Sequence, residues 1–451
     1  MIILAHSIWQ LKNNKNKQVK QKTILLVVLI SLSLNLFAQA DKSFIVLKNP
    51  LNLQRDSELI VLSRKKIESK IGKLQPNEYV RIYKENATPL VVQFDDINQD
   101  GIWDEAVFLY SFKPEETVTL KLKKSETLMD TNVQPLAHVR MKLKNADDKF
   151  GPSVKHVDMP YQNKPTDFSK HALPTYLTEG PGWENDKVAF RLYFDTRNAK
   201  DIYGKRIPGM VMDTVGANPK NSYHKLSAWG MDILAVGKSL GAGGLAFSYK
   251  LENGKDTLVR LGELNIKSES YDEIADGPIR AIFKMDYHWE LNHQPVEVVE
   301  YISIWGGQYF YQSKIFVKGH HLPKDLKVDM GIANFYDNRS GNFSSGNTKV
   351  LYSFGKQSEI KDDLGMAIFS RAEDFSKFWS IGKEVTAASD ITQTYLSEEK
   401  VNSLKPAVYR YFACWNKTNT LFKDENNFVN FLHSEAEKFS NPIITLIKNK
   451  K

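Results

Sequence analysis

Apolar and polar residues alternate along most of this chain, and that period of two limits the folds open to it. Residues 117–123 place Val118, Leu120 and Leu122 on one side, and residues 138–144 repeat the pattern. Successive side chains of a β-strand point to opposite faces of a sheet, so such segments are typical of strands with one buried face. Helical spacing stands out in one stretch near the C-terminus. We therefore predict an all-β protein with one C-terminal helix.

The strand segments fall into two groups of unequal size. Residues 41–145 predict a small N-terminal β-domain, and residues 146–451 predict a much larger antiparallel sandwich, the expected catalytic domain. Residues 146–186 are rich in Pro, Asn, Asp and Lys, a composition typical of a linker or a long functional loop. The helix is expected at 424–439, where apolar residues share one stripe until a proline ends it.

The N-terminus has the layout of an export signal. It carries five lysines and no acidic residue before Asp41, with an apolar stretch at 24–37 and then an Ala-Gln-Ala sequence that suits signal peptidase. We predict a signal peptide over residues 1–40, with the mature chain in the periplasm or secreted to the medium, away from the membrane. The alternative is an uncleaved anchor, which the short, interrupted apolar stretch disfavours.

The charge of the chain argues against nucleic-acid binding, and its cysteine content argues against an internal disulfide and a zinc site of the CxxC type. The formal net charge is +8, but five of the 61 basic residues lie in the predicted signal peptide. The mature chain would therefore carry 56 basic and 53 acidic residues, a net charge of +3, without a block rich in Lys and Arg. The single cysteine, Cys414, can form neither an internal disulfide nor a zinc site of the CxxC type. We predict no nucleic-acid partner.

One predicted strand collects groups that suit an anionic sugar. Lys187, Arg191, Tyr193 and Asp195 alternate with apolar residues and so share one face. Arg191 with Lys187 would form a cradle for a carboxylate or sulfate, since a guanidinium grips such a group with two N–H donors. Trp183 would stack on a sugar ring, and Tyr193 would line the same site. The alternative is a solvated face whose charged side chains pair with one another.

A loop further along supplies groups for proton transfer. Tyr223 and His224 are adjacent in the sequence, and Trp229 lies further along, next to a glycine. Histidine and tyrosine together can accept and donate a proton, while Trp229 offers a second stacking surface. A lone histidine is more often a hydrogen-bonded structural residue, so that alternative stays open. The glycines at 237–244 match neither a P-loop nor the dinucleotide fingerprint.

A second strand face carries candidate substrate-binding residues. Arg280, Lys284, Asp286 and His288 share one face of a predicted strand. With the face of Arg191 they predict a large sheet whose open side is lined by polar and aromatic groups, where Arg280 and His288 contact substrate. A polar sheet face of this kind suits a long carbohydrate chain.

One loop of the N-terminal domain predicts a calcium site. Asp96, Asn98, Asp100 and Asp104 stand at positions 1, 3, 5 and 9 of the EF-hand ligand spacing, with a glycine at the turn. The glutamate of position 12 is missing, and the flanks are predicted strands rather than helices. A structural calcium ion and an ion-free turn rich in Asx residues are therefore both open.

Four stretches of the sequence resemble a family of secreted proteins from bacteria that degrade marine and plant polysaccharides. They are residues 94–108, 179–197, 222–244 and 277–283, and the resemblance extends over essentially the whole mature chain. It implies a large domain like the galactose-mutarotase-type supersandwich, a fold that many polysaccharide lyases share. It also implies an activity, that of an oligosaccharide dehydratase of ulvan degradation.

The activity implied by this resemblance sets a substrate and a pathway partner. The enzyme would remove water from a glucuronic or iduronic acid at the non-reducing end of a sulfated oligosaccharide, next to rhamnose 3-sulfate. The product would carry a 4,5-unsaturated uronyl end, which a downstream unsaturated glycuronyl hydrolase accepts. The elimination requires no cofactor.

The chemistry of this elimination suggests a role for each candidate residue. Arg191 and Lys187 would neutralise the uronate. His224 would take the C5 proton and Tyr223 would protonate the leaving 4-hydroxyl, with these two roles interchangeable, while Glu184 would orient the histidine. Two other classes stay open: a polysaccharide lyase, whose leaving group is a sugar, and a non-catalytic glycan-binding protein, which needs only the Trp and Arg positions.

Overall fold

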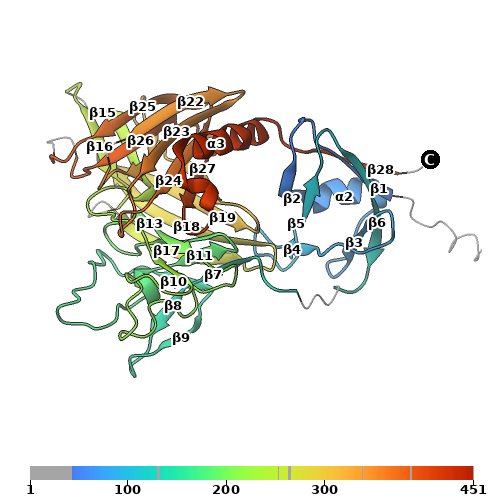
Figure 1. Ribbon diagram of the computed structural model, residues 1–451, viewed down its shortest axis with the longest axis horizontal. Helices are drawn as coiled ribbons and strands as arrows, with labels where there is room; N and C mark the ends of the chain where they lie inside the picture. Colours follow the sequence, from blue (N-terminus) through green and yellow to red (C-terminus); the bar gives the residue numbers. More distant parts are fainter. Residues whose placement is uncertain are drawn as a thin grey trace, which may run out of the picture.

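The computed structural model describes residues 43–128, 133–251, 253–262, 266–337, 339–385 and 389–449 (Figure 1). The predicted signal peptide, residues 1–40, lies outside them. Within the described residues, strands dominate and form a small unit at one end of the molecule and a much larger one at the other. No helix in these ranges has the length and apolar character needed to cross a bilayer.

The small unit consists of two antiparallel sheets and a short helix. Its four-stranded sheet has the order β28 (Ile444–Asn449), β1 (Ser43–Lys48), β6 (Thr117–Ser125), β3 (Tyr79–Tyr83). Its three-stranded sheet has the order β2 (Arg55–Ser63), β5 (Glu105–Phe112), β4 (Gln93–Asp95). Helix α2 (Arg64–Ile71) begins where the Ser63 side chain accepts a hydrogen bond from the Lys66 N–H, and it buries Ile67 and Ile71.

The large unit is organised around one nine-stranded antiparallel sheet. Its strand order is β10 (His156–Asp158), β17 (Ile266–Ala275), β18 (Arg280–Leu291), β19 (Gln294–Trp305), β20 (Phe310–Lys318), β27 (Ala407–Trp415), β24 (Leu364–Arg371), β23 (Thr348–Gly355), β22 (Ser340–Ser345). The smallest sheet pairs β8 (Lys142–Lys144) with β9 (Phe150–Ser153).

Two five-stranded sheets pack on one side of the nine-stranded sheet, which we call its inner face. The first has the order β14 (Gly230–Asp232), β13 (Lys200–Lys205), β12 (Val188–Leu192), β11 (Gly182–Asn185), β7 (Ala137–Arg140). The second has the order β16 (Asp256–Arg260), β15 (Ala242–Lys250), β21 (Lys327–Ala333), β26 (Thr394–Lys400), β25 (Phe375–Ile381).

Aromatic side chains fill the space between these layers. Phe190 of β12 lies 4.9 Å from Tyr311 of the nine-stranded sheet, and Phe247 of β15 lies 5.2 Å from Trp289, both measured between ring centroids. All four rings are buried in one continuous core. Burial of such rings is the main favourable term in holding the layers together.

The opposite side of the nine-stranded sheet, its outer face, is covered in two places. Helix α3 (Glu425–Ser440) packs over part of it through Phe428, Leu432 and Phe439. The N-terminal unit approaches another part, where the Gln93 side chain donates to the Arg280 carbonyl and accepts from the Arg280 N–H. Short 3₁₀ turns lie at Leu177–Glu179 (η1) and Thr420–Lys423 (η3).

The predicted fold class is confirmed, and the predicted domain boundary differs from the structure. The chain is all-β, with a small N-terminal unit, a large antiparallel sandwich and a C-terminal helix. However, β7 pairs with β11 of the large unit, before the predicted boundary at 145. Strand β28 leaves the large unit and pairs with β1. An alternating pattern shows which face of a strand is buried but not which strand it pairs with. The assignment of β7 and β28 from sequence order alone therefore failed.

Candidate functional site

The polar centre of the large unit lies on the side of the first five-stranded sheet that faces away from the nine-stranded sheet. Phe190 points inward from β12, so its neighbour Arg191 points the other way. Segments before β11 and between β13 and β14 cover this side, packing Val211, Met212 and Val215 against the sheet. Arg191 is consequently only 2% exposed.

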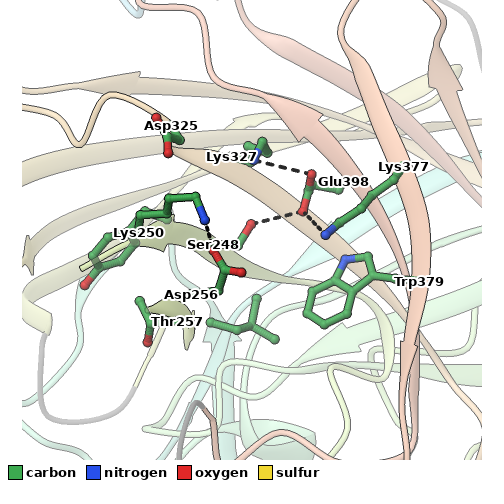
Figure 2. A pocket seen from close by; sticks show the side chains of 11 residues that line it. Ser248, Lys250, Asp256, Thr257, Asp325, Lys327, Lys377, Trp379 and Glu398 are labelled. Carbon is green, nitrogen blue, oxygen red and sulfur yellow. Dashed lines mark hydrogen bonds and ion pairs between the residues drawn. The ribbon is translucent and has the colours of Figure 1, made fainter. Parts of the chain in front are cut away.

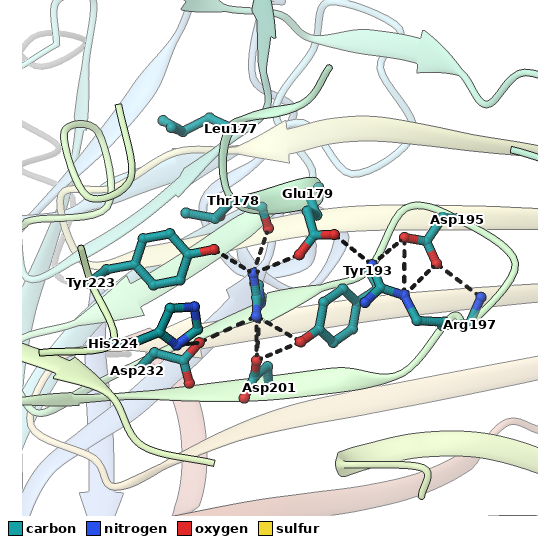
Figure 3. A network of polar contacts seen from close by, with 12 residues as sticks. Leu177, Thr178, Glu179, Tyr193, Asp195, Arg197, Asp201, Tyr223, His224 and Asp232 are labelled. Atoms are coloured by element: carbon teal, nitrogen blue, oxygen red, sulfur yellow. Dashed lines mark hydrogen bonds and ion pairs between the residues drawn. The ribbon is translucent and has the colours of Figure 1, made fainter. Parts of the chain in front are cut away.

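Three carboxylates surround the Arg191 guanidinium. They are those of Glu179, Asp201 and Asp232, which Figure 3 labels. The Arg191 Nε and Nη2 donate to Asp201 Oδ2 at 3.0 and 2.7 Å, and Nη2 also donates to Asp232 Oδ2 at 3.2 Å. Nη1 donates to Glu179 Oε2 at 3.3 Å. Because Arg191 and Asp201 lie directly opposite each other on β12 and β13, the strand register itself sets the closest pair. We call these four residues the acid cluster.

The backbone that presents Glu179 is strained. Thr178 and Glu179 have φ values of 51° and 65°, in the left-handed region that few non-glycine residues adopt. Buried Arg140 holds this turn, donating to the carbonyls of Leu177 and Gly180 at 3.0 and 2.7 Å. Such strain persists only where surrounding bonds over-determine it, and it is concentrated at functional sites.

Tyr193 and Arg197 extend the acid cluster toward solvent. The Tyr193 hydroxyl lies 2.6 Å from Arg191 Nη2 and donates to Asp201 Oδ2 at 3.0 Å. Arg197 stacks over the Tyr193 ring at 3.8 Å and donates to Glu179 Oε1 at 2.7 Å. Its side chain is 32% exposed, so it is the cation of this region that solutes can reach.

His224 and Tyr223 lie at the rim of the acid cluster. The His224 side chain is 59% exposed, and its Nδ1 lies 3.5 Å from Asp232 Oδ2. The Tyr223 hydroxyl is 3.4 Å from Arg191 Nη1, and the tyrosine and histidine rings are 4.4 Å apart. The structure thus brings together the two predicted proton-transfer residues and Arg191.

The surroundings favour the neutral forms of the ionisable groups at this rim. Burial, and then the nearby Arg191 charge, lower the pKa of His224 below its usual 6.5. Burial raises the pKa of Tyr223 above 10. Burial and the neighbouring Asp201 carboxylate raise the pKa of Asp232 well above its usual range, so it holds a proton more readily than an ordinary aspartate. A neutral imidazole can accept a proton, and a neutral phenol can donate one.

The rim opens into two adjoining hollows. One, of about 340 Å³, is lined by residues that include Phe168, Glu179 and Tyr223. The other, of about 370 Å³, is lined by residues that include Arg197 and Glu359. Both include Arg191, Tyr193 and His224 among their lining residues. We call the two together the active-site cleft, as the candidate location for catalysis, because a ligand spanning them would contact His224.

Three predicted roles near Arg191 are wrong in the structure. Trp183 is 1% exposed and packs against Phe190 and Phe283 on the core side of the sheet, so no sugar can stack on it. Glu184 is fully buried; it pairs with Lys205 at 2.5 Å and accepts from two backbone N–H groups, instead of orienting His224. Lys187 lies before β12, pairs with Asp186 at 3.1 Å and lines neither hollow of the active-site cleft.

The predicted carboxylate cradle of Arg191 is also wrong as a free site. The expected open face is covered by loops, and every guanidinium nitrogen of Arg191 already donates to a partner within the protein. The acid cluster thus uses Arg191 to neutralise buried carboxylates. The alternation of residues 187–195 showed the correct side of the strand but not what covers it.

The remaining predicted binding residues lie elsewhere. Arg280 and His288 are on the outer face of the nine-stranded sheet, across the sandwich from His224, so they cannot contact the same sugar. Arg280 is bound by Asp95 and by Glu105 at 2.7 Å, and His288 is exposed near Asp286. Trp229 is half-buried and lines a hollow that adjoins the active-site cleft at Tyr223.

The predicted calcium loop is held by its own backbone. Asp96 accepts from the N–H groups of Asp100 and Gly101, and Asp104 accepts from those of Ile97 and Asn98. Asn98 and Asp100 likewise accept from N–H groups two residues on. Over the described part of the chain, no group of three or more His, Cys, Asp or Glu side chains is placed to hold a metal ion. Calcium binding here stays a prediction.

Sequence reasoning missed Glu179, Asp201, Asp232 and Arg197. Glu179 begins the stretch 179–197 and Asp232 lies within the stretch 222–244, but nothing in a single sequence shows that they meet. Asp201 could have been found from the hairpin between β12 and β13, because its register places residue 201 opposite residue 191. The acid cluster is therefore a product of strand pairing and of loop covering.

A further hollow lies on the second five-stranded sheet (Figure 2). Its charged groups pair with one another: Lys377 lies 3.5 Å and Lys327 3.7 Å from Glu398. Trp379 donates its indole N–H to Asp329, outside the hollow's lining. No histidine is among the described residues that line it, so we regard the active-site cleft as the better candidate for proton transfer.

Comparison with solved structures gives weak superpositions. An α-mannosidase from Enterococcus faecalis V583 superposes with a TM-score of 0.49 at 8% identity, and a glycosyl hydrolase family 38 protein from Enterococcus faecalis with 0.47 at 9%. Both superpositions cover 90% of this chain, which spans about half the length of those proteins, 46% and 47%. At these scores they carry no weight in the functional argument.

Sequence comparison gives a more extensive match. The chain is 23% identical over 424 residues to Uncharacterized protein P7 of Formosa agariphila, covering 90% of this chain and 93% of that protein. The family described as domain of unknown function DUF4861 matches residues 47–444, nearly all of the described structure. The chain therefore belongs to the DUF4861 family.

Proposed function

We propose that this protein is an exported, carbohydrate-active carbon–oxygen lyase, an oligosaccharide dehydratase. Its substrate would be a glucuronic or iduronic acid at the non-reducing end of an ulvan-type sulfated oligosaccharide. The observation that carries the proposal is the pairing of His224 with Tyr223 at the rim of the active-site cleft, next to Arg191. The sequence resemblance supplies the substrate class.

The proposed reaction uses both neutral groups. His224 accepts the C5 proton, the electrons of that C–H bond form the C4–C5 double bond, and the C4–O bond breaks. Tyr223 gives its proton to the departing hydroxyl, which leaves as water. The imidazolium then returns a proton to the tyrosinate, directly or through solvent, so the enzyme is regenerated. The reverse assignment, with Tyr223 as base, stays open.

The acid cluster and its neighbour Arg197 can stabilise the negative charge that builds up on the uronate. A protonated Asp232 has an O–H to donate to a carboxylate, and Arg197, which pairs with Asp195 and Glu179 but is 32% exposed, presents its exposed side to the same group. Arg191 would act indirectly, by holding Tyr223 and Asp232 in place. This replaces the direct contact between Arg191 and the uronate expected from the sequence.

The test is mass spectrometry of uronic-acid-ended sulfated oligosaccharides incubated with protein beginning at Asp41. Dehydration lowers the mass of each chain by one water, whereas a polysaccharide lyase would shorten the chains and a glycan-binding protein would leave them unchanged. The product should then be a substrate for an unsaturated glycuronyl hydrolase. Shortened or unchanged chains across a panel of such oligosaccharides would overturn the proposal.

A matched pair of histidine variants locates the chemistry. We expect His224→Ala to lower kcat/KM by about a hundredfold or more, the scale of losing one general base. His156 is the control, since it is also exposed and lies 2.6 Å from a carboxylate, that of Asp272 on β17. His156→Ala should retain full turnover. Equal turnover in both variants would move the active site elsewhere.

A further inference from the structure

The outer face of the nine-stranded sheet forms a second cleft, between the sheet and the N-terminal unit. Its volume is about 490 Å³. Strands β18, β19, β20 and β27 form its floor, and β2 and β5 of the N-terminal unit contribute Glu58, Leu59, Val61 and Glu105. It lies across the sandwich from His224, so it is separate from the active-site cleft. We call it the interdomain cleft.

Strand register sets polar side chains in rows on its floor. Ser303, Gln312 and Arg410 lie opposite one another on three neighbouring strands. Two residues along, Tyr301 and Lys314 form the next row. Residues two apart on a strand share a face, so both rows point into the same cleft.

Arg410 is a cation without an acidic partner in this cleft. Its guanidinium stacks on Phe310 at 4.4 Å and on Phe439 at 4.6 Å, and its Nε donates to Gln312 at 3.2 Å. Among the residues that the structure describes, no carboxylate oxygen lies within 4.0 Å of it. Such a guanidinium keeps free N–H donors in a fixed fork, the geometry that binds an oxyanion with two bonds.

The other charged residues that line the cleft or border it are paired, which leaves Arg410 and Lys314 as the cations of its lining that have no ion pair among the described residues. Lys284 pairs with Asp272 at 3.1 Å, and Arg280 with Glu105 at 2.7 Å. On the opposite wall, Glu58 forms an ion pair with Arg55 at 3.0 Å. Lys314 is exposed, and within the described residues it has no ion pair. The interdomain cleft therefore has an excess of positive charge.

Aromatic and polar groups surround this charge. Tyr301 and Phe316 meet edge to face with centroids 6.0 Å apart, and both line the cleft. A sugar ring has an apolar face that packs on such rings, and hydroxyls that suit the Gln312 amide and the Ser303 hydroxyl. A bare inorganic anion would use the cations alone.

We propose that the interdomain cleft binds an anionic sugar unit, with its sulfate or carboxylate on Arg410 and Lys314 and its ring against Tyr301. Binding here is independent of turnover in the active-site cleft and does not rest on the proposed reaction. It gives the N-terminal unit a role in recognition, because β2 and β5 form one wall of the site.

The test is isothermal titration calorimetry of the full chain with glucose 6-sulfate and with glucuronate, against glucose and inorganic sulfate. We expect at least one anionic sugar to bind tenfold or more tightly than both glucose and sulfate. Affinity should fall tenfold or more in Arg410→Gln and severalfold in Lys314→Gln. It should be unchanged in Lys284→Gln, the control on the same sheet face.

Three outcomes would overturn the proposal. They are no binding of either anionic sugar, inorganic sulfate binding as tightly as both of them, and equal affinity in Arg410→Gln, Lys314→Gln and the unaltered chain. Lys314 is exposed, so its variant stays informative if Arg410→Gln is destabilised. Binding that persists in both variants but is lost in His224→Ala would place the sugar in the active-site cleft instead.

Discussion

Two arginines on opposite sides of the sandwich have opposite surroundings. Arg191 is 2% exposed and lies among three carboxylates, with a donor bond from each nitrogen to a protein acceptor. Arg410 is half-buried, stacks on aromatic rings and contacts no carboxylate among the described residues. Both were placed on their faces by the same strand periodicity. The difference arises from what covers each face.

This difference separates structural charge from charge available for binding. A buried guanidinium that neutralises three acids cannot be removed without exposing them to one another in a poorly solvated interior. A guanidinium stacked on aromatic rings has its planar, weakly hydrated face covered by those rings, while its edge stays open to another acceptor. We infer that Arg191 organises the active-site cleft and that Arg410 recognises an anion.

The largest expected effect is on stability. Arg191→Met should lower the free energy of unfolding by about 3–5 kcal/mol, the scale of leaving buried charges without their partner. Arg410→Met should cost only about 1 kcal/mol, since no acid depends on it. Urea denaturation of both variants measures the two values. Similar losses in the two variants would break the distinction between the two arginines.

The second expectation concerns pH. Because the pKa of His224 is lowered below 6.5, its neutral, proton-accepting form predominates above that pH and is lost as pH falls through the lowered pKa. kcat/KM should therefore drop by about a hundredfold two pH units below the inflection. Tyr223, with its pKa raised above 10, should impose no loss before pH 10.

Anion binding in the interdomain cleft should follow a different pH window. Burial lowers the pKa of Arg410 to about 10, so it remains charged through neutral pH. Its affinity for glucose 6-sulfate should be constant from about pH 5 to 8 and should weaken as pH nears 10. Kinetics and calorimetry over the same buffers would check both profiles. An activity inflection well above pH 6.5 would contradict the role of His224.

The smallest effect separates two members of the acid cluster. Asp201 accepts two bonds from Arg191 and one from Tyr193 through a single oxygen, so Asp201→Asn should cost about 1–3 kcal/mol of stability. Burial and the Asp201 carboxylate raise the pKa of Asp232, which brings it nearer to the protonated form that an amide resembles, so Asp232→Asn should cost less than about 1 kcal/mol. Thermal unfolding at neutral pH compares them. A greater loss for Asp232→Asn would mean that Asp232 is ionised.

Local patterns predicted the fold class and the side of the strand on which Arg191 lies. Alternation is a property of neighbouring residues, so it survives in any tertiary setting. The same is true of the C-terminal helix, whose apolar stripe at Phe428, Leu432 and Phe439 packs as the spacing indicates. The Tyr223 and His224 pair was also found, and in the loop that holds them the two rings lie 4.4 Å apart.

The errors arose where long-range packing decides. The residues next to Trp183 in the sequence predict an exposed stacking surface, but in the structure the nine-stranded sheet covers this side chain. Arg280 and Arg191 lie in similar sequence patterns, but they belong to two different sheets that are stacked on each other. Each side chain points away from the other sheet, so the two arginines lie on opposite sides of the sandwich. Nothing in the local sequence places Glu184 near His224, and in the structure it pairs with Lys205 of a different strand. Such contacts depend on sheet order, which periodicity does not encode.

Strand β28 has a consequence for the order of events during synthesis. It pairs with β1 along its whole length, joining Ser43 to Asn449. A chain that leaves the ribosome from its N-terminus therefore has β1 as an open edge until its final segment emerges, and an unpaired edge invites intermolecular pairing. The first unit to be translated is thus the last that can be completed. Only after the whole large sandwich has been made can β1 be covered.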